Sequence, residues 1–486
     1  MLKKSFLGTI WLFGVVLMLQ SCSLHVLHDQ SNTDNGNHQT KVAPSTIRVS
    51  VASNGIQADG YSSGASISAD GQYVVFSSEA SNLVAGGPHL DGEGNVIGDV
   101  YIHNNKTNVT EIVSVASDGT RANDWSGTPA ISADGRYVAF YSSATNLVDE
   151  EVGTDENGDS LGGIFIHDTK TGETVLVNVA SDGTPANDYS GSKMGLSISA
   201  DGRYVTFGSS ATNLVDNDNN GQFDVFVHDM LTGTNTIVSV ASDGTEADGT
   251  SDGGRISADG RYVAFLSWAS NLVDNDSNGF NDIFVHDMLT GETTRISVAS
   301  DGTEANADCN DIPSISADGR YVAFGSSATN LVEGITNIDN NGNPASNMFV
   351  HDTLTGVTTR INVASDGTQA NNNSGGGTIS ANGRYVAFQS FASNLVADDN
   401  NVDTDGNPIT DIFVHDTLTG ITTIVSVASD GTQANGHSNG PSISADGRYV
   451  AFGSMASNLV TGDTNVDADG NPLSDIFIRD RGWPLN

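Results

Sequence analysis

The chain has little cysteine and few basic residues for its length of 486 residues. Its two cysteines are Cys22 and Cys309, so we expect no disulfide framework. Lysine and arginine together number 19 against 59 aspartates and glutamates, which gives a formal net charge of -40. A charge of this sign repels phosphate backbones and anionic membrane surfaces, so we expect no nucleic-acid partner. The net charge leaves cations, basic proteins and neutral glycans as candidate partners.

Long apolar segments are also absent, apart from one run near the N-terminus. Residues 6–19 are apolar, follow Lys3 and Lys4, and are too few to span a membrane. A short apolar run behind two positive charges indicates a secretion signal that is removed on export.

The apolar run ends in the sequence LQSC, which resembles the lipobox of bacterial lipoproteins. This resemblance implies a signal peptide over residues 1–21 and a lipid on Cys22, which would then be the only attachment to a membrane. By the same resemblance, Ser23 implies the outer membrane, facing the periplasm or the cell surface. An ordinary signal peptide with a chance cysteine is the alternative. Residues 22–45 have few apolar side chains and no periodicity, so we expect a flexible tether.

The rest of the chain repeats one motif, SADGRYVAF or a close variant. Its copies begin at Ser68, Ser132, Ser199, Ser257, Ser316, Ser380 and Ser444. Each copy precedes a loop, a segment such as DIFVHD, a TG turn and a segment such as TTRISVASDGT. Each unit therefore predicts four short strands, around ISA, YVAF, IFVHD and TTRISVA, because these segments are rich in Val, Ile, Phe, Tyr and Thr. Seven units predict one all-β domain, a seven-bladed β-propeller over residues 46–486.

The last unit stops at DIFIRDRGWPLN, before its fourth strand. Residues 46–58, TIRVSVASNGIQA, match the fourth strand and crossover of the other units, such as TTRISVASDGTEA. We therefore expect the N-terminal strand to complete the seventh blade and close the ring. We also expect a monomer.

These motifs resemble the TolB-type, WD-like β-propeller repeat family over nearly all of residues 46–486, most clearly in 257–291. Three features depart from the family pattern. Alanine replaces the usual proline before the DG turn, Asn382 replaces an aspartate, and the insertions are long. The separate α/β domain of TolB has no room in the tether, so the partners of that family are not carried over.

Residues 216–224, DNDNNGQFD, and residues 274–282, DNDSNGFND, share a pattern that suits calcium. Calcium takes about six to eight oxygen ligands, and a central glycine lets alternate side chains of a tight loop point inward. A polar turn is the alternative, because Asn, Asp and Gly also favour turns. The predicted ligands are Asp216, Asp218, Asn220, Gln222 and Asp224, and in the second copy Asp274, Asp276, Asn278, Phe280 and Asp282.

Two longer versions of this loop occur in NVDTDGNPITD and NVDADGNPLSD. They add the candidate calcium ligands Asp403, Asp405, Asp411, Asp467, Asp469 and Asp475. In the first, second and fifth units the pattern degrades, with His89 or Gly153 at the first position and Gly163 or Asn347 at the last, so we expect turns there.

The strand order places the ADGR-type turns on one face of the ring, the short-turn face. The loops between second and third strands, together with the crossovers between blades, belong to the opposite long-loop face. We expect the turn arginines to be solvated or locally paired, although a partner-binding ring is the alternative. They are Arg136, Arg203, Arg261, Arg320, Arg384 and Arg448.

The histidine of each FVHD segment is expected to hydrogen-bond across strands rather than to bind metal, since rotational symmetry keeps the copies apart. The aspartate that follows it is expected to cap its turn. These histidines are His103, His167, His228, His286, His351 and His415, and Arg479 stands in the seventh unit. Cys309 occupies a position that is serine in the other units, so we expect a packed side chain there and no nucleophile.

No catalytic triad or metal-binding set remains once the repeat consensus is subtracted. The sequence therefore favours a lipid-anchored, calcium-binding propeller of the cell envelope that binds a protein or a glycan, with Trp125 and Trp268 as contact candidates. A glycan-active lyase or hydrolase that uses Lys193, Arg255 or His437 is one alternative. A purely structural envelope protein is another.

Overall fold

The computed structural model describes residues 42–90, 94–149, 152–155, 160–191, 195–216, 218–339, 341–399, 401–402, 406–467 and 470–482. The predictions of a signal peptide, of a lipid on Cys22 and of most of the tether lie outside these residues. Within the described part of the chain, no helix has the length and apolar character needed to cross a membrane.

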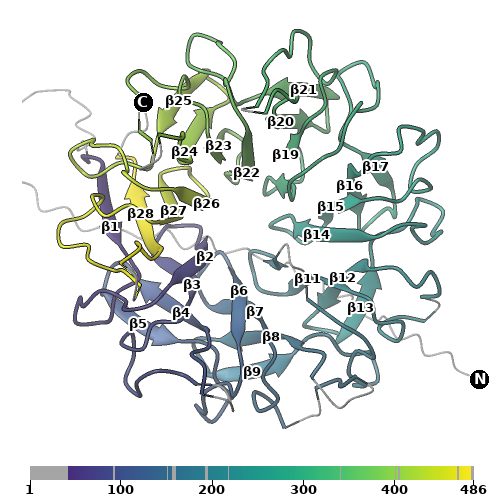
Figure 1. The fold of residues 1–486 in the computed structure, drawn as a ribbon. Helices are drawn as coiled ribbons and strands as arrows, with labels where there is room; N and C mark the ends of the chain where they lie inside the picture. Colours follow the sequence, from purple (N-terminus) through teal and green to yellow (C-terminus); the bar gives the residue numbers. More distant parts are fainter. Residues whose placement is uncertain are drawn as a thin grey trace, which may run out of the picture. The chain divides into compact units, whose positions relative to one another are not determined.

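The described residues form seven four-stranded antiparallel sheets arranged as a ring (Figure 1). This confirms the predicted seven-bladed propeller. The first strands are β2 (Ser62–Ile67), β6 (Ser126–Ile131), β10 (Ser197–Ile198), β14 (Ser251–Ile256), β18 (Ser314–Ile315), β22 (Ser374–Ile379) and β26 (Ser438–Ile443). The second strands are β3 (Tyr73–Ser78), β7 (Tyr137–Ser142), β11 (Tyr204–Ser209), β15 (Tyr262–Ser267), β19 (Tyr321–Ser326), β23 (Tyr385–Ser390) and β27 (Tyr449–Ser454).

The third and fourth strands of each blade carry side chains of the candidate site. The third strands are β4 (Asp99–Asn104), β8 (Gly163–Asp168), β12 (Asp224–Asp229), β16 (Asp282–Asp287), β20 (Asn347–Asp352), β24 (Asp411–Asp416) and β28 (Asp475–Asp480). The fourth strands are β5 (Val109–Ile112), β9 (Glu173–Leu176), β13 (Thr234–Ile237), β17 (Thr293–Arg295), β21 (Val357–Arg360), β25 (Ile421–Ile424) and, in the seventh blade, β1 (Ser45–Arg48).

The N-terminal strand closes the ring. The seventh sheet has the order β1-β28-β27-β26, and β1 pairs antiparallel with β28 so that Ile47 faces Ile478. Residues from the two ends of the propeller thus share one blade, as the sequence predicts.

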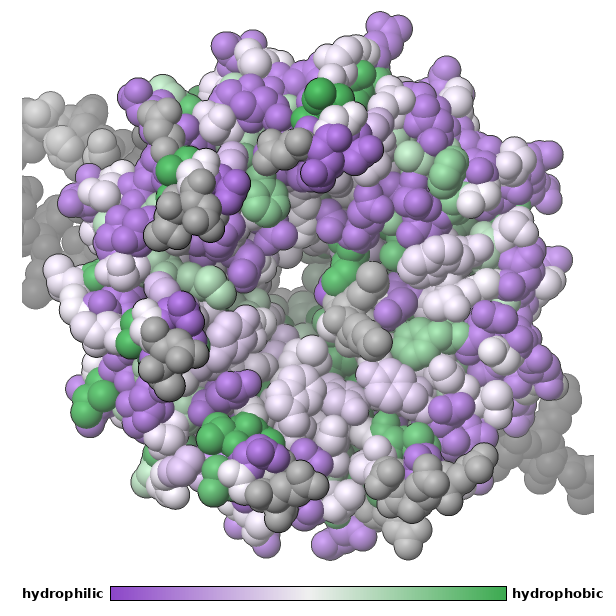
Figure 2. Space-filling view, viewed as in Figure 1, coloured by the Kyte–Doolittle hydropathy of each residue, from purple (hydrophilic) through white to green (hydrophobic). Residues whose placement is uncertain are grey.

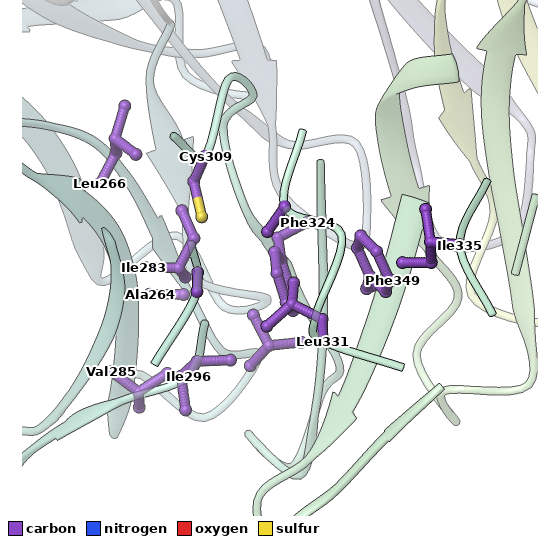
Figure 3. Close-up of a cluster of buried hydrophobic side chains, with 13 residues drawn as sticks. Ala264, Leu266, Ile283, Val285, Ile296, Cys309, Phe324, Leu331, Ile335 and Phe349 are labelled. Carbon is purple, nitrogen blue, oxygen red and sulfur yellow. The ribbon is translucent and has the colours of Figure 1, made fainter. Parts of the chain in front are cut away.

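The apolar core lies between neighbouring blades. Buried side chains of β15 and β16 pack with those of β19 and β20 in one cluster, in which Cys309 is fully buried (Figure 3). In each blade an aromatic residue of the second strand stacks on one of the third, as Phe265 does on Phe284 at 5.8 Å between ring centroids. Both faces of each sheet are therefore covered, which explains why the YVAF and IFV segments are apolar throughout.

The first strands differ from the prediction. In five blades, all but the third and fifth, they begin well before the ISA segment, and their pairing with the second strand shifts register, as between Asp252 and Arg255 in the fourth blade. Gly253 adopts a φ of 69° in this bulge. These segments are rich in glycine and serine, which have little preference for strands, so the sequence pattern did not reveal them.

On the short-turn face, the turn arginines are paired locally, as expected. Arg261 Nε and Nη2 donate to the two carboxylate oxygens of Asp287 at 2.9 and 2.7 Å, and the guanidinium lies over the Tyr262 ring. Asp287 Oδ1 also accepts the backbone N–H of Leu289, which confirms the predicted cap. The Arg261 guanidinium holds the pKa of the Asp287 carboxyl well below its usual range. The same pair recurs for the other five turn arginines.

The FVHD histidines bond across strands, which confirms the second local prediction. His286 Nδ1 lies 2.9 Å from Thr293 Oγ1, and that hydroxyl donates to the Val240 carbonyl in the preceding crossover. The ring Nδ1–H therefore donates to the threonine, and the histidine joins two blades. Each crossover also forms a small hairpin, as the bridge between Val240 and Glu246 shows. The tip of this hairpin packs on blade 4, since Ser242 Oγ accepts from Thr293 N at 2.9 Å. The sequence places the crossovers on the long-loop face. In the structure they also extend along the next blade to the start of its fourth strand.

Candidate functional site

The third strand of each blade begins with a buried residue at the long-loop face. It is Asp99, Asp224, Asp282, Asp411 or Asp475 in blades 1, 3, 4, 6 and 7, and Gly163 or Asn347 in blades 2 and 5. A hydroxyl from the segment after the fourth strand holds each carboxylate, as Ser239 Oγ holds Asp224 Oδ1 at 2.6 Å. We call this residue and the side chains facing it the carboxylate pocket of the blade.

In blade 3, the carboxylate pocket contains a second buried acid. Asp218 is 7% exposed and Asp224 is fully buried. Asp218 Oδ1 has no hydrogen-bond partner among the described residues. Burial, together with the charges of Asp224 and Glu246, raises the pKa of Asp218 to about 6. Asn220 Nδ2 donates to Asp224 Oδ2 at 2.8 Å, so the asparagine forms part of the wall.

In blade 4, an arginine enters the equivalent pocket. Arg295 Nη1 lies 3.0 Å from Asp276 Oδ1 and 3.5 Å from Asp282 Oδ2, while Nη2 lies 2.6 Å from Glu304 Oε1. The three carboxylates therefore share one guanidinium. Asn278 Nδ2 donates to Asp282 as Asn220 does to Asp224. The two loops that look alike in sequence thus differ in their charge balance.

Blades 1 and 7 also contain cationic side chains in this pocket. In blade 7, Arg48 Nη1 lies 3.1 Å from Asp463 and 3.3 Å from Asp475. In blade 1, Arg121 Nη2 and His89 Nδ1 approach Asp99 Oδ2 at 2.6 and 2.9 Å.

Blade 6 resembles blade 3. Asp399 is 5% exposed and Asp411 is 1% exposed. Burial and the charge of Asp411 raise the pKa of Asp399 to about 7, and burial raises that of Asp411 to about 6. Asn401 Nδ2 donates to Asp411 Oδ2 at 2.8 Å. A shallow groove lined by Asn401 and Ile424 opens beside this pocket.

Blades 2 and 5 lack the acid of the third strand. In blade 5, Asn347 takes its place and pairs with Asn337, whose Nδ2 donates to Asn347 Oδ1 at 2.9 Å. Arg360 occupies the position of Arg295, but its Nε and Nη1 atoms have no partner among the described residues. Burial lowers the pKa of this arginine.

The remaining predicted ligands lie away from the carboxylate pockets or serve as turns. Asp216 and Asp274 are exposed at the loop surface. Gln222 and Phe280 donate their backbone N–H groups to Asn220 and Asn278, which are local Asx turns. In the seventh blade, Asp467 accepts from Asn471 in a hairpin turn, whereas Asp475 lies with Arg48 and Asp463. The candidates Asp403, Asp405 and Asp469 lie outside the described residues.

Among the described residues, no group of three or more His, Cys, Asp or Glu side chains is gathered closely enough to hold a metal ion. Calcium binding therefore stays a prediction. The pockets of blades 3 and 6 each bring two carboxylates together, Asp218 with Asp224 and Asp399 with Asp411, as oxygen ligands for a cation.

A chain of aromatic side chains crosses the long-loop face over blades 2 and 3. Trp125 lies beside Tyr141 at 5.8 Å between centroids, Tyr141 beside Tyr189 at 6.2 Å, and Tyr189 beside Phe223 at 6.3 Å. Trp125 is 38% exposed and the other three are partly exposed. We call these four residues the aromatic arc. Figure 2 shows the polar surface of this face and, below its central opening, paler patches in the region of β6 and β7.

Glycines hold the aromatic arc in place. A Cβ atom at Gly127 would lie 2.4 Å from Trp125 Cζ2, and one at Gly191 would lie 2.6 Å from the Tyr141 ring. A Cβ atom at Gly208 would lie 2.2 Å from the Phe223 ring. Any larger residue at these three positions would displace a ring. The glycines therefore leave the space that the rings of the aromatic arc occupy. Sequence analysis found Trp125 but missed its three neighbours, because they come from segments distant along the chain.

Of the residues of the enzyme alternative, the structure describes Arg255 and His437, which belong to blades 4 and 7. Arg255 lies within β14 rather than in a crossover, and its Nη1 donates to the Gly195 and Leu196 carbonyls at 3.3 and 3.1 Å. His437, at the start of blade 7, accepts the backbone N–H of Thr410 of blade 6 through Nδ1 at 3.1 Å. Lys193 lies outside the described residues.

Comparison with solved structures supports the propeller fold. An oligogalacturonate lyase solved in complex with manganese is 12% identical over 90% of this chain and 92% of its own, with a TM-score of 0.51. The β-propeller domain of the trilobed protease from Pyrococcus furiosus is 12% identical over 87% of this chain and 93% of its own, with a TM-score of 0.50. A TolB from Agrobacterium tumefaciens also matches, at 16% identity over 66% of this chain and 88% of its own, with a TM-score of 0.36.

At these identities the likeness concerns the fold and not the activity. No protein-family model matches the chain, and no curated protein matches its sequence. The chain is thus a seven-bladed propeller of four-stranded blades, a fold it has in common with proteins of several activities.

Proposed function

We propose that this protein is a lipid-anchored β-propeller of the cell envelope that binds a neutral glycan on its long-loop face, with calcium held in the loops of that face. A basic protein is the alternative ligand. The lipobox-like sequence at Cys22 supports the anchor, and the acidic loops support the calcium.

The aromatic arc carries the binding proposal. Its four rings are partly exposed, neighbour one another across two blades, and are fixed by glycines. Rigid aromatic side chains offer a large contact area at a low entropic cost, and their faces pack against the C–H groups of sugar rings. Because the chain carries a net charge of -40, uncharged sugars suit this surface better than anionic ones.

The test is binding of soluble neutral oligosaccharides to the purified protein and to Trp125→Ala and Tyr189→Ala variants. We expect each variant to lose about tenfold in affinity, or about 1.4 kcal/mol, since aromatic anchors dominate such sites. Trp268→Ala is the matched control, because Trp268 is 50% exposed but lies in blade 4, outside the aromatic arc. Its affinity should stay within about twofold of the parent value.

Equal affinity in all variants would refute the role of the aromatic arc. Absence of glycan binding together with salt-sensitive binding of a basic protein probe would instead favour the acidic surface as the recognition element.

A further inference from the structure

One strand position distinguishes the carboxylate pockets of blades 3 and 6 from those of blades 4 and 7. Register pairing places Arg295 opposite Phe284 in blade 4 and Ile237 opposite Phe226 in blade 3. The same position holds Arg48 in blade 7 and Ile424 in blade 6. Blades 4 and 7 thus supply a guanidinium from the fourth strand, while blades 3 and 6 supply an apolar side chain.

The acids are nevertheless retained where the arginine is missing. Blades 3, 4, 6 and 7 all carry a second acid five residues after the asparagine of the NLV segment, which is Asp218, Asp276, Asp399 or Asp463. Two buried carboxylates without a cation repel each other and lose their hydration, which costs several kcal/mol unless a positive charge is supplied. In blade 5, the second acid is replaced by Ile335 and the first by Asn347.

Asp218 gives an independent sign of a missing partner in blade 3. Its side chain is more than nine-tenths buried, and Oδ1 has no hydrogen-bond partner among the described residues. Such orphaned acceptors are rare in folded proteins and call for a bound group. Asp399 in blade 6 is buried to the same degree beside Asp411, whose carboxylate already accepts bonds from Ser426 and Asn401.

We propose that blades 3 and 6 each bind one calcium ion, between Asp218 and Asp224 and between Asp399 and Asp411. The ion takes the space that a guanidinium occupies in blades 4 and 7. This inference rests on the calcium half of the proposed function and narrows it, because residues 274–282 then hold no ion despite their calcium-like sequence.

The donors in these pockets suit a weak site for a hard cation. Each pocket offers two carboxylates, and a backbone carbonyl lies beside each, since Ala247 O accepts from Asn220 Nδ2 and Ala434 O accepts from Asn401 Nδ2. Glu246 adds a third acid beside the blade 3 pocket. With so few charged ligands, we expect dissociation constants of roughly 0.1 to 1 mM, typical of extracellular calcium sites.

The experiment transplants the arginine between blades. The chelator-treated protein is titrated with calcium chloride by calorimetry, in parallel with Ile237→Arg, Ile424→Arg and the double variant. We expect each single variant to lose one bound ion and the double variant to lose both, because the new guanidinium neutralises the pocket. Leu176→Arg is the matched control, since it lies at the same strand position in blade 2, where Gly163 stands in place of the third-strand acid. It should keep the parent stoichiometry.

The reverse exchange tests blade 4. Arg295→Ile leaves Asp276, Asp282 and Glu304 without their guanidinium, and we expect it to gain one calcium ion. If an arginine variant fails to fold, Asp218→Asn or Asp399→Asn replaces it and should lose the same ion.

The outcomes separate the two levels of the proposal. Calcium binding that persists in the Ile237→Arg/Ile424→Arg protein and in Asp218→Asn/Asp399→Asn would place the ions elsewhere and overturn this inference alone. A parent protein that binds no calcium would overturn both this inference and the calcium half of the proposed function. The glycan measurement would be unaffected by either result.

Discussion

The two faces of the propeller use their charges in opposite ways. On the short-turn face, six blades repeat the same arginine and aspartate pair with nearly identical distances, and the charges neutralise each other locally. On the long-loop face, the carboxylate pocket contains arginine in some blades, acids alone in others, and asparagine or glycine in two. Uniform repetition therefore marks parts that hold the ring together. Variation between blades marks the face where binding is expected.

The largest effect should follow from a glycine on the short-turn face. Gly260 has a φ of 78°, and a Cβ atom there would lie 2.2 Å from the Tyr204 ring of the preceding blade. We expect Gly260→Ala to lower the free energy of unfolding by about 3 to 5 kcal/mol, through backbone strain and overpacking together. Urea denaturation of the purified protein measures the change.

Gly279→Ala on the long-loop face is the matched control. Gly279 has a φ of 70° but nothing within 4 Å of its Cβ position, so backbone strain alone should cost about 1 to 2 kcal/mol. Equal losses in the two variants would show that the contact with Tyr204 does not matter, and the contrast between the faces would fail at this point.

A second comparison concerns cations on opposite faces. Arg48 is nearly buried beside Asp463 and Asp475, and we expect Arg48→Met to lower the free energy of unfolding by about 3 kcal/mol because two buried acids lose their partner. Lys106→Met is the control on the short-turn face. Its exposed pair with Asp70, at 3.9 Å, should contribute less than about 1 kcal/mol. A similar small loss in both variants would contradict the description of the carboxylate pocket as buried.

Acid sensitivity should arise from the histidines that join the blades. Burial lowers the pKa of His103 and of His415 from an ordinary value near 6.5 to about 4. The unfolded chain therefore binds protons first, and stability falls as the pH drops from about 6.5 towards 4. For one such histidine, we expect a loss of about 2 kcal/mol between pH 7 and pH 5.

The check is chemical denaturation at both pH values for the parent and for His415→Gln. The variant should lose about 2 kcal/mol less on acidification than the parent, although it is less stable at pH 7. The neighbouring Asp416 raises the pKa of His415, so its charge already opposes the effect of burial. An identical acid response in parent and variant would assign the sensitivity to other groups.

The sequence predicted most of the fold because each blade repeats the same strands and turns. Seven copies of SADGRYVAF set the blade number, and residues 46–58 predicted the ring closure that β1 and β28 form. The glycine-rich part of the first strands was missed, since its pairing depends on the neighbouring second strand rather than on its own composition.

The candidate site was only partly predictable. Asp218, Asp224 and their blade 4 equivalents stand in a recognisable loop pattern. Arg295 lies 13 residues after Asp282, in the fourth strand of the blade. The loop pattern does not show which side chains of that strand face the pocket. Alignment of the fourth strands would have revealed the alternation between Ile237 and Arg295, which is the signal that separates the two loops.

The smallest effect should come from a substitution of Cys309, which stands at the long-loop end of blade 5 where the other blades have serine. Its side chain is fully buried, and the backbone of Cys309 pairs with that of Ser326, in the place where the hydroxyls of Ser251 and Ser267 lie 2.8 Å apart in blade 4. Burial holds the pKa of the thiol well above its ordinary value, so we expect no reaction with a thiol reagent in the native protein. Cys309→Ser should change the free energy of unfolding by less than about 1 kcal/mol, because the hydroxyl finds the partner that it has in other blades. Urea denaturation and labelling before and after unfolding check both statements, and rapid labelling of the native protein would show that this end of the blade opens to solvent.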